Sequence, residues 1–193
     1  GPLQASWAQL EELRAAVAGL QARGRKVFGW LERPGHPEYF LASAFDRIAL
    51  APTTTLDVVG LRTEVTFFKG ALDLLGVRAS FEAAGAYKGF GEPFTRHTMS
   101  PALRESLDYV LSDVHRGFVA ATARGRALAP EAMQVLVDGG PYTAKEALEA
   151  GLVDEVLYPD RWRRSIRAAL GERPRKRELE ADSEAGDLGA IAA

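Results

Sequence analysis

Hydrophobic residues recur along the first quarter of the chain in two patterns, one typical of helices and one of buried strands. Residues 6–24 combine an amino-terminal capping box with apolar positions every three or four residues, which predicts a helix that a glycine ends. Short apolar runs at 26–31 and 47–51 predict two buried strands. Between them, 39–44 is apolar without alternation, and its position favours a short buried helix.

The middle of the chain repeats this succession. Apolar spacing over 65–75 predicts a helix, and 77–83 reads as a strand. The stretch 85–100 is rich in glycine and has no period, which is typical of a loop that is either functional or disordered. A serine-proline pair then opens a long amphipathic helix expected over 101–125.

The carboxy-terminal part closes with one more helix and one more strand. A capping box predicts a helix over 143–151, and 152–157 reads as a strand. Alternating helices and strands indicate an α/β layered fold with a mostly parallel sheet and flanking helices. We expect one domain over 1–172 and a linker or disordered tail over 173–193, where periodicity is lost.

Composition narrows the chemistry. The 193 residues include no cysteine and three scattered histidines (His36, His97 and His115), so we expect no metal site and no cofactor. A net charge of -2 provides no general attraction for nucleic acid. Basic residues gather over 161–177, a run that favours a solvated face over an anion site. No apolar run is long enough to span a membrane.

The glycine-rich loop carries the strongest candidate chemistry, a lysine at position 88 between Tyr87 and Gly89. Burial disfavours the ammonium form of a lysine, so a desolvated lysine can act as a general base near neutral pH. The alternative is a solvated loop lysine. Phe90 and Phe94 suit an apolar peptide and equally suit a core.

The loop sequence GAYKGFGEPFTRHTMSPALRE, residues 85–105, closely resembles the lysine-bearing loop of signal peptide peptidase A, a family of membrane-bound serine–lysine proteases. Three further segments agree with that family, and they lie at 39–44, 68–77 and 147–154. The resemblance covers roughly residues 1–160 and implies the ClpP/crotonase fold. It also implies that the chain is an amino-terminal half whose first strand or strands lie upstream.

In that family the lysine that matches Lys88 is the general base of a Ser-Lys dyad. The position of the family's serine falls on His36 here, with Pro37 and Glu38 in place of glycines. Imidazole cannot replace an activated hydroxyl, and proline has no N–H to bind an oxyanion. Ser43 is the nearby alternative nucleophile, although its apolar surroundings favour a structural hydroxyl.

The resemblance therefore implies a lysine half-site that needs a serine from a second domain or a neighbouring subunit. It also implies a peptide substrate, a homo-oligomer and association with the cytoplasmic membrane through an upstream anchor. Tyr87 and Glu92 either position Lys88 or anchor its loop. A non-catalytic crotonase-like scaffold remains the alternative function, and acyl-CoA chemistry ranks last because the loop is of the protease type.

Overall fold

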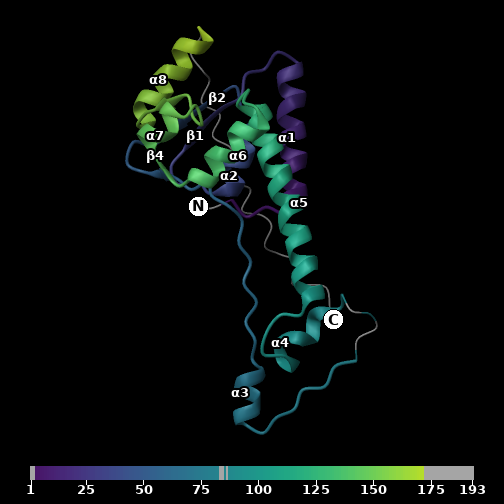
Figure 1. Cartoon of the computed structure of the whole chain (residues 1–193). Helices are drawn as coiled ribbons and strands as arrows, with labels where there is room; N and C mark the ends of the chain where they lie inside the picture. Colours follow the sequence, from purple (N-terminus) through teal and green to yellow (C-terminus); the bar gives the residue numbers. More distant parts are fainter. Residues whose placement is uncertain (1–2, 83–84, 86, 172–193) are drawn as a thin grey trace, which may run out of the picture.

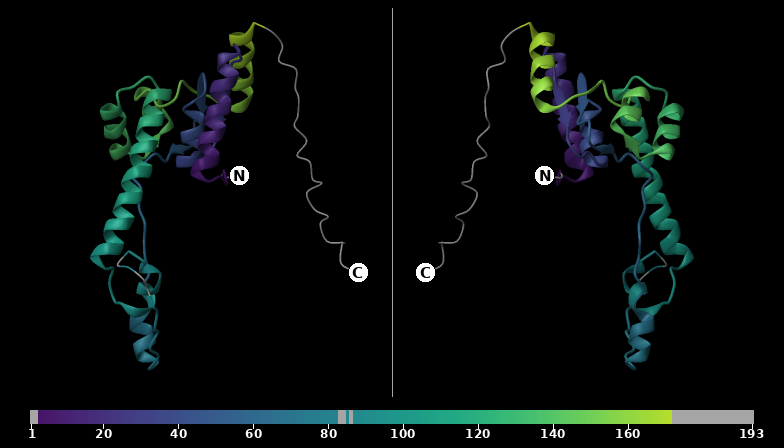
Figure 2. Two further views of the ribbon diagram at one scale, coloured as in Figure 1. Left: turned by 90° about the vertical axis from the view of Figure 1, so that its right-hand side faces the viewer. Right: turned by 90° about the vertical axis from the view of Figure 1, so that its left-hand side faces the viewer.

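The computed structural model describes residues 3–82, 85 and 87–171. This part of the chain forms a body, which carries the sheet, and an arm that projects away from it (Figures 1 and 2). We call residues 60–82, 85 and 87–110 the arm and the other described residues the body. The tail expected over 173–193 lies outside the described residues.

The sheet of the body is parallel and has the order β1-β2-β5. Its strands are β1 (Phe28–Leu31), β2 (Arg47–Leu50) and β5 (Glu155–Val156). The strands predicted over 26–31 and 47–51 are confirmed, whereas the one predicted over 152–157 is reduced to two residues. A separate antiparallel pair joins β3 (Thr55–Leu56) to β4 (Tyr142–Thr143).

Six helices of the described chain belong wholly or partly to the body. They are α1 (Trp7–Ala22), α2 (His36–Ala42), α5 (Pro101–Gly125), α6 (Pro130–Gly139), α7 (Ala144–Glu149) and α8 (Pro159–Leu170). Capping boxes at Ser6 and Thr143 start α1 and α7 as predicted. Helices that flank a parallel sheet make this an α/β fold, as the sequence indicates.

Helices cover both faces of the sheet. Ile48 and Leu50 of β2 belong to the main core, together with residues of α1, α2 and α5. On the opposite face, Trp162 of α8 meets Phe28 edge to face with ring centroids 6.3 Å apart. The indole N–H of Trp30 donates to the carbonyl of Leu157, which holds the chain between β5 and α8 against β1.

The carboxy-terminal end of α5 crosses the end of α2 at close range. A Cβ on Gly125 would lie 1.9 Å from the carbonyl oxygen of Ser43, so glycine is required at this contact. The Arg14 guanidinium of α1 completes the junction. It donates to the carbonyls of Phe40 and Ala121 and, at 2.7 Å, to the hydroxyl of Ser43. Three helices are therefore joined at one point.

The arm differs most from the sequence prediction. The helix expected over 65–75 is limited to α3 (Lys69–Leu74), because the chain before it lies against the following loop. The Phe68 N–H donates to the carbonyl of Pro93 at 2.6 Å. The strand expected over 77–83 is wrong for its described residues, 77–82, which pair with no other described strand.

Four further elements were not predicted. The loop at 85–100 contains the short 3₁₀ helix η1 (Gly89–Gly91) and α4 (Glu92–Thr95). Helix α6 starts at a proline without a side-chain cap. Helix α8 begins at Pro159 and presents the exposed residues Arg161, Arg163, Arg164 and Arg167, which is the solvated face expected of the basic run in its described part.

The close contact between Gly125 of α5 and Ser43 at the end of α2 leads to a prediction about the stability of the fold. We expect Gly125→Ala to lower the free energy of unfolding by about 2–3 kcal/mol, since the added methyl overlaps backbone that cannot move freely. Gly117→Ala in the same helix is the matched control, because its Cβ would meet nothing within 4 Å. It should raise stability by about 0.5–1 kcal/mol through helix propensity. Urea unfolding followed by circular dichroism compares the two, and equal effects would contradict the close crossing.

Candidate active site

Lys88 lies in the arm, directly before η1. Its backbone N–H donates to the Gly85 carbonyl at 3.3 Å, which closes the turn that leads into η1. Its side chain is exposed, and no described residue forms an ion pair or hydrogen bond with its ammonium group. The glycine that follows packs closely on α5, since a Cβ on Gly89 would lie 2.9 Å from the end of the Leu103 side chain, which would have to shift. The lysine is thus presented outward from a loop pressed against α5.

Glu92 connects this loop to the start of α5. Its carboxylate accepts hydrogen bonds from the hydroxyl and the backbone N–H of Ser100. The Ser100 hydroxyl in turn accepts from the Leu103 N–H at 3.1 Å and so caps α5. These bonds, the one from the hydroxyl first, lower the pKa of the Glu92 carboxyl below its ordinary value. Glu92 therefore anchors the loop to the helix.

Tyr87 makes a second tie to α5. Its hydroxyl donates to the carboxylate of Glu105 at 3.1 Å, and this bond to a negative charge raises the pKa of Tyr87. Neither Tyr87 nor Glu92 forms a hydrogen bond with Lys88 within the part of the chain described here. These contacts are the ones expected if Tyr87 and Glu92 anchor the loop to α5, and not those expected if they position Lys88 directly.

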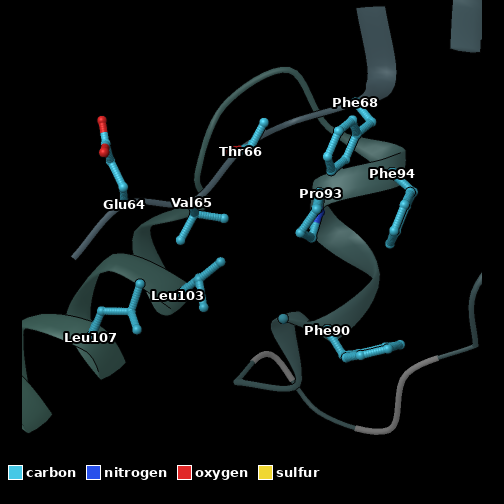
Figure 3. A pocket seen from close by; sticks show the side chains of 10 residues that line it. Glu64, Val65, Thr66, Phe68, Phe90, Pro93, Phe94, Leu103 and Leu107 are labelled. Atoms are coloured by element: carbon cyan, nitrogen blue, oxygen red, sulfur yellow. The ribbon is translucent and has the colours of Figure 1, made fainter. Parts of the chain in front are cut away.

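An apolar groove of about 480 Å³ lies beside the lysine loop. Figure 3 shows Val65, Thr66 and Phe68 along one side and Leu103 and Leu107 of α5 along the other. The groove also includes the loop residues that follow Lys88, among them Gly89, Phe90, Pro93 and Phe94. Its size and lining suit apolar side chains of an extended peptide.

The sequence assigned several of these groove residues to another role. The apolar spacing over 65–75 predicts Val65 in a helix, and the amphipathic pattern over 101–125 predicts Leu103 and Leu107 on the apolar face of the long helix. The available signal was the β-branched pair Val65-Thr66, which disfavours a helix start. The exposure of Phe90, 84%, shows that it is not a core residue.

The structure places His36 and Ser43 away from the lysine. Helix α2 belongs to the body, while η1 and α4 belong to the arm (Figure 1). His36 is half-buried at the first turn of α2, with Nε2 at 2.5 Å from the Val59 carbonyl oxygen. Ser43 is fully buried, and its hydroxyl donates to the Phe40 carbonyl and accepts from Arg14. Neither residue meets Lys88.

The other two histidines make ordinary side-chain contacts. His97 lies 3.4 Å from the Asp73 carboxylate in the arm, and His115 contacts the Gln134 amide between α5 and α6. Among the residues described, no group of three or more His, Asp or Glu side chains is placed to hold a metal ion.

Asp154, the last residue of the 147–154 segment, joins the sheet to α5. Its carboxylate accepts from the Ile48 N–H at 2.7 Å and from the Arg126 guanidinium at 2.7 and 3.1 Å. Partial burial opposes ionisation, yet the bonds from Arg126 and Ile48 outweigh it and lower the pKa of Asp154. The role of this segment in the chain is therefore structural.

These observations define an α/β domain that presents a lysine on a glycine-rich loop beside an apolar groove. A family model described as peptidase family S49 matches residues 20–171, and the chain belongs to this family.

Individual relatives agree with the family. The chain is 33% identical to "Protease 4" of Salmonella typhi over 72% of its length and 24% of that protein. It is 23% identical to "Serine protease SPPA, chloroplastic" of Arabidopsis thaliana over 88% of its length and 25% of that protein. "Putative signal peptide peptidase SppA" of Enterococcus faecium is 28% identical over 63% of the chain and 35% of that protein. The resemblance to signal peptide peptidase A is confirmed, and the chain spans about a quarter of the first two relatives.

No helix in the described residues is both long and apolar enough to cross a lipid bilayer.

The Glu92 anchor predicts how the arm responds to acid. A carboxyl with a lowered folded-state pKa contributes stability that is present above its unfolded pKa and is lost as pH falls through the folded value. We therefore expect the protection factor of the Leu103 amide, its intrinsic exchange rate divided by the observed rate at the same pH, to fall below about pH 4.3 in the wild type. In Glu92→Gln the protection factor should already be low at pH 7 and should change less with pH.

Glu64→Gln is the control for this measurement, since Glu64 is exposed and pairs with Arg62. It should exchange like the wild type. If Glu92→Gln also did so, the anchoring role of Glu92 would be wrong.

Proposed function

We propose that this chain is the lysine-contributing half of a serine-type endopeptidase that resembles signal peptide peptidase A and degrades cleaved signal peptides. The observation that carries the proposal is the position of Lys88, exposed on a family-type loop at the end of an apolar groove. Membership of peptidase family S49 and the printed names of the relatives support a protease.

The proposed reaction is acyl transfer through a Ser-Lys dyad. The neutral amine of Lys88 takes the proton from a serine hydroxyl, and the serine oxygen attacks the scissile carbonyl carbon. The peptide C–N bond then breaks, with the proton passing to the leaving amine, and water hydrolyses the acyl-enzyme. This requires the serine oxygen within about 3 Å of the lysine nitrogen.

The serine is proposed to come from a second domain or a neighbouring subunit. Ser43, the candidate within this chain, is fully buried and has both its donor and acceptor bonds occupied. A lysine base must also be desolvated, and Lys88 is exposed here. One partner surface would therefore supply the nucleophile and cover the lysine together.

The groove supports the substrate assignment. Phe68, Phe94, Leu103 and Leu107 line it with apolar surface, which suits the apolar side chains of a peptide. Cleaved signal peptides contain an apolar core segment that would suit such a lining. An attachment to the cytoplasmic membrane and a homo-oligomeric assembly belong to the same proposal.

The first test is Lys88→Ala in the complete assembly. We expect peptidase activity on an apolar peptide to fall at least about 10³-fold with unchanged folding, because the serine loses its base. Lys145→Ala is the matched control, since Lys145 is an exposed, ion-paired lysine on α7. Wild-type activity in Lys88→Ala would instead support the non-catalytic scaffold.

A second test asks whether the described chain holds its own nucleophile. We expect a fluorophosphonate probe, which phosphonylates activated serines with loss of fluoride, to leave the isolated chain unlabelled. Labelling that disappears in Ser43→Ala but persists in Ser112→Ala would overturn the half-site model. Mass spectrometry of the intact protein reads the outcome directly.

A further inference from the structure

The segment 77–82 has the sequence of a strand and no strand partner among the described residues. Its apolar residues Val77, Ala79 and Phe81 alternate with the polar residues Arg78, Ser80 and Glu82, which is the period of a strand with one apolar face. Among the backbone hydrogen bonds between described residues, the segment takes part through the Val77 N–H, which donates to the Leu72 carbonyl and closes α3. Unpaired backbone of this kind is a template for another strand.

The apolar face of the segment is already held by the arm. Phe81 stacks on Phe94 with ring centroids 5.8 Å apart and meets Phe90 edge to face at 6.3 Å. A Cβ on Gly91 would lie 2.7 Å from the Phe81 ring, so the segment lies tightly against η1. Packing thus fixes which side faces inward, while no described strand pairs with the hydrogen-bonding edge of residues 78–82.

The open edge is accessible. Beyond α3 the chain runs along the outer side of the arm, away from the body (Figure 1), and the two side views show the arm projecting by itself (Figure 2). Val77 and Phe81 keep 47% and 45% of their surface exposed despite the aromatic contacts. A second strand would cover part of this surface.

The charges of the segment select the partner. In an antiparallel pairing with its own copy, centred on Ser80, Arg78 of each chain lies opposite Glu82 of the other, and Ala79 lies opposite Phe81. A parallel pairing in register would instead place like charges opposite each other. Alternate residues of a strand direct their N–H and C=O groups to opposite edges, so 77, 79 and 81 share one edge and 78, 80 and 82 share the other. Because the Val77 N–H is already bonded, the edge of 78, 80 and 82 is the one left for a partner, and this register pairs those residues.

We propose that two copies of this chain associate through antiparallel pairing of residues 77–82 about a two-fold axis at Ser80. The contact is isologous, so the same Arg78–Glu82 ion pair forms once on each side of the axis. Six residues a strand bury little surface, and the association is accordingly weak in the isolated chain. It goes beyond the proposed function, because neither Lys88 nor the groove takes part.

Cysteine cross-linking tests the register. The chain has no cysteine, so Ser80→Cys introduces a single thiol. Across a hydrogen-bonded antiparallel pair the two Cα atoms are about 5.5 Å apart, within the roughly 4.4–6.8 Å that a disulfide spans. We expect mild oxidation to give a disulfide-linked dimer at least about tenfold faster than in Thr63→Cys, an exposed position in the arm's other extended segment.

A charge exchange in the Ser80→Cys background tests the partner. Arg78→Glu or Glu82→Arg alone should slow cross-linking about tenfold, because each turns two opposite-charge contacts into repulsive ones. The double exchange R78E/E82R should restore the rate to within about twofold, and circular dichroism checks that all variants fold alike.

Equal cross-linking at 63 and 80, or a double exchange no faster than either single one, would overturn the proposal. None of these variants alters Lys88. Cross-linking therefore tests the strand pairing, and peptidase activity in the complete assembly tests the proposed function, so either proposal can be wrong without the other.

Discussion

The structure depends on α5, a single 25-residue helix that serves the body at one end and the arm at the other. At 1.5 Å per residue such a helix is about 37 Å long. Its last turns are buried where Gly125 meets the Ser43 carbonyl, and Arg14 secures the same junction. Its first turn is capped by Ser100, which Glu92 holds. The position of the lysine loop relative to the sheet is therefore set by a crossing of two helices far from the loop.

Stability and chemistry are divided between the two parts. The body contains the sheet and the continuous core, and its histidine and serine candidates, His36 and Ser43, contact backbone carbonyls through Nε2 and the hydroxyl. The arm carries Lys88, the apolar groove and large exposed apolar residues such as Leu74, which is 91% exposed. Apolar surface of this extent is typical of a region that a partner covers. The exposed Lys88 and the segment 77–82, which pairs with no other described strand, both lie in this region.

The sequence predicted the body better than the arm, and particular residues show why. The capping boxes at Ser6 and Thr143 act within four residues of chain, so they could be recognised without tertiary structure. The strand read at 77–83 had the right alternation, yet alternation does not supply a neighbour to bond with. The helical stripe expected from Val65 failed because Phe68 bonds and stacks on the loop at Pro93 and Phe94. That contact joins positions 25 residues apart, beyond the reach of a periodicity argument.

The sequence alone determined the α/β class, the long helix α5 and the lysine loop with its family resemblance, because each rests on local period, local capping or a contiguous motif. Only the tertiary structure decided that Tyr87 and Glu92 bond to α5, and that Ser43 is sealed beneath Arg14. Likewise, only it showed the groove beside Lys88. These features depend on which distant segments meet and how deeply each side chain is buried. Both follow from packing of the whole chain.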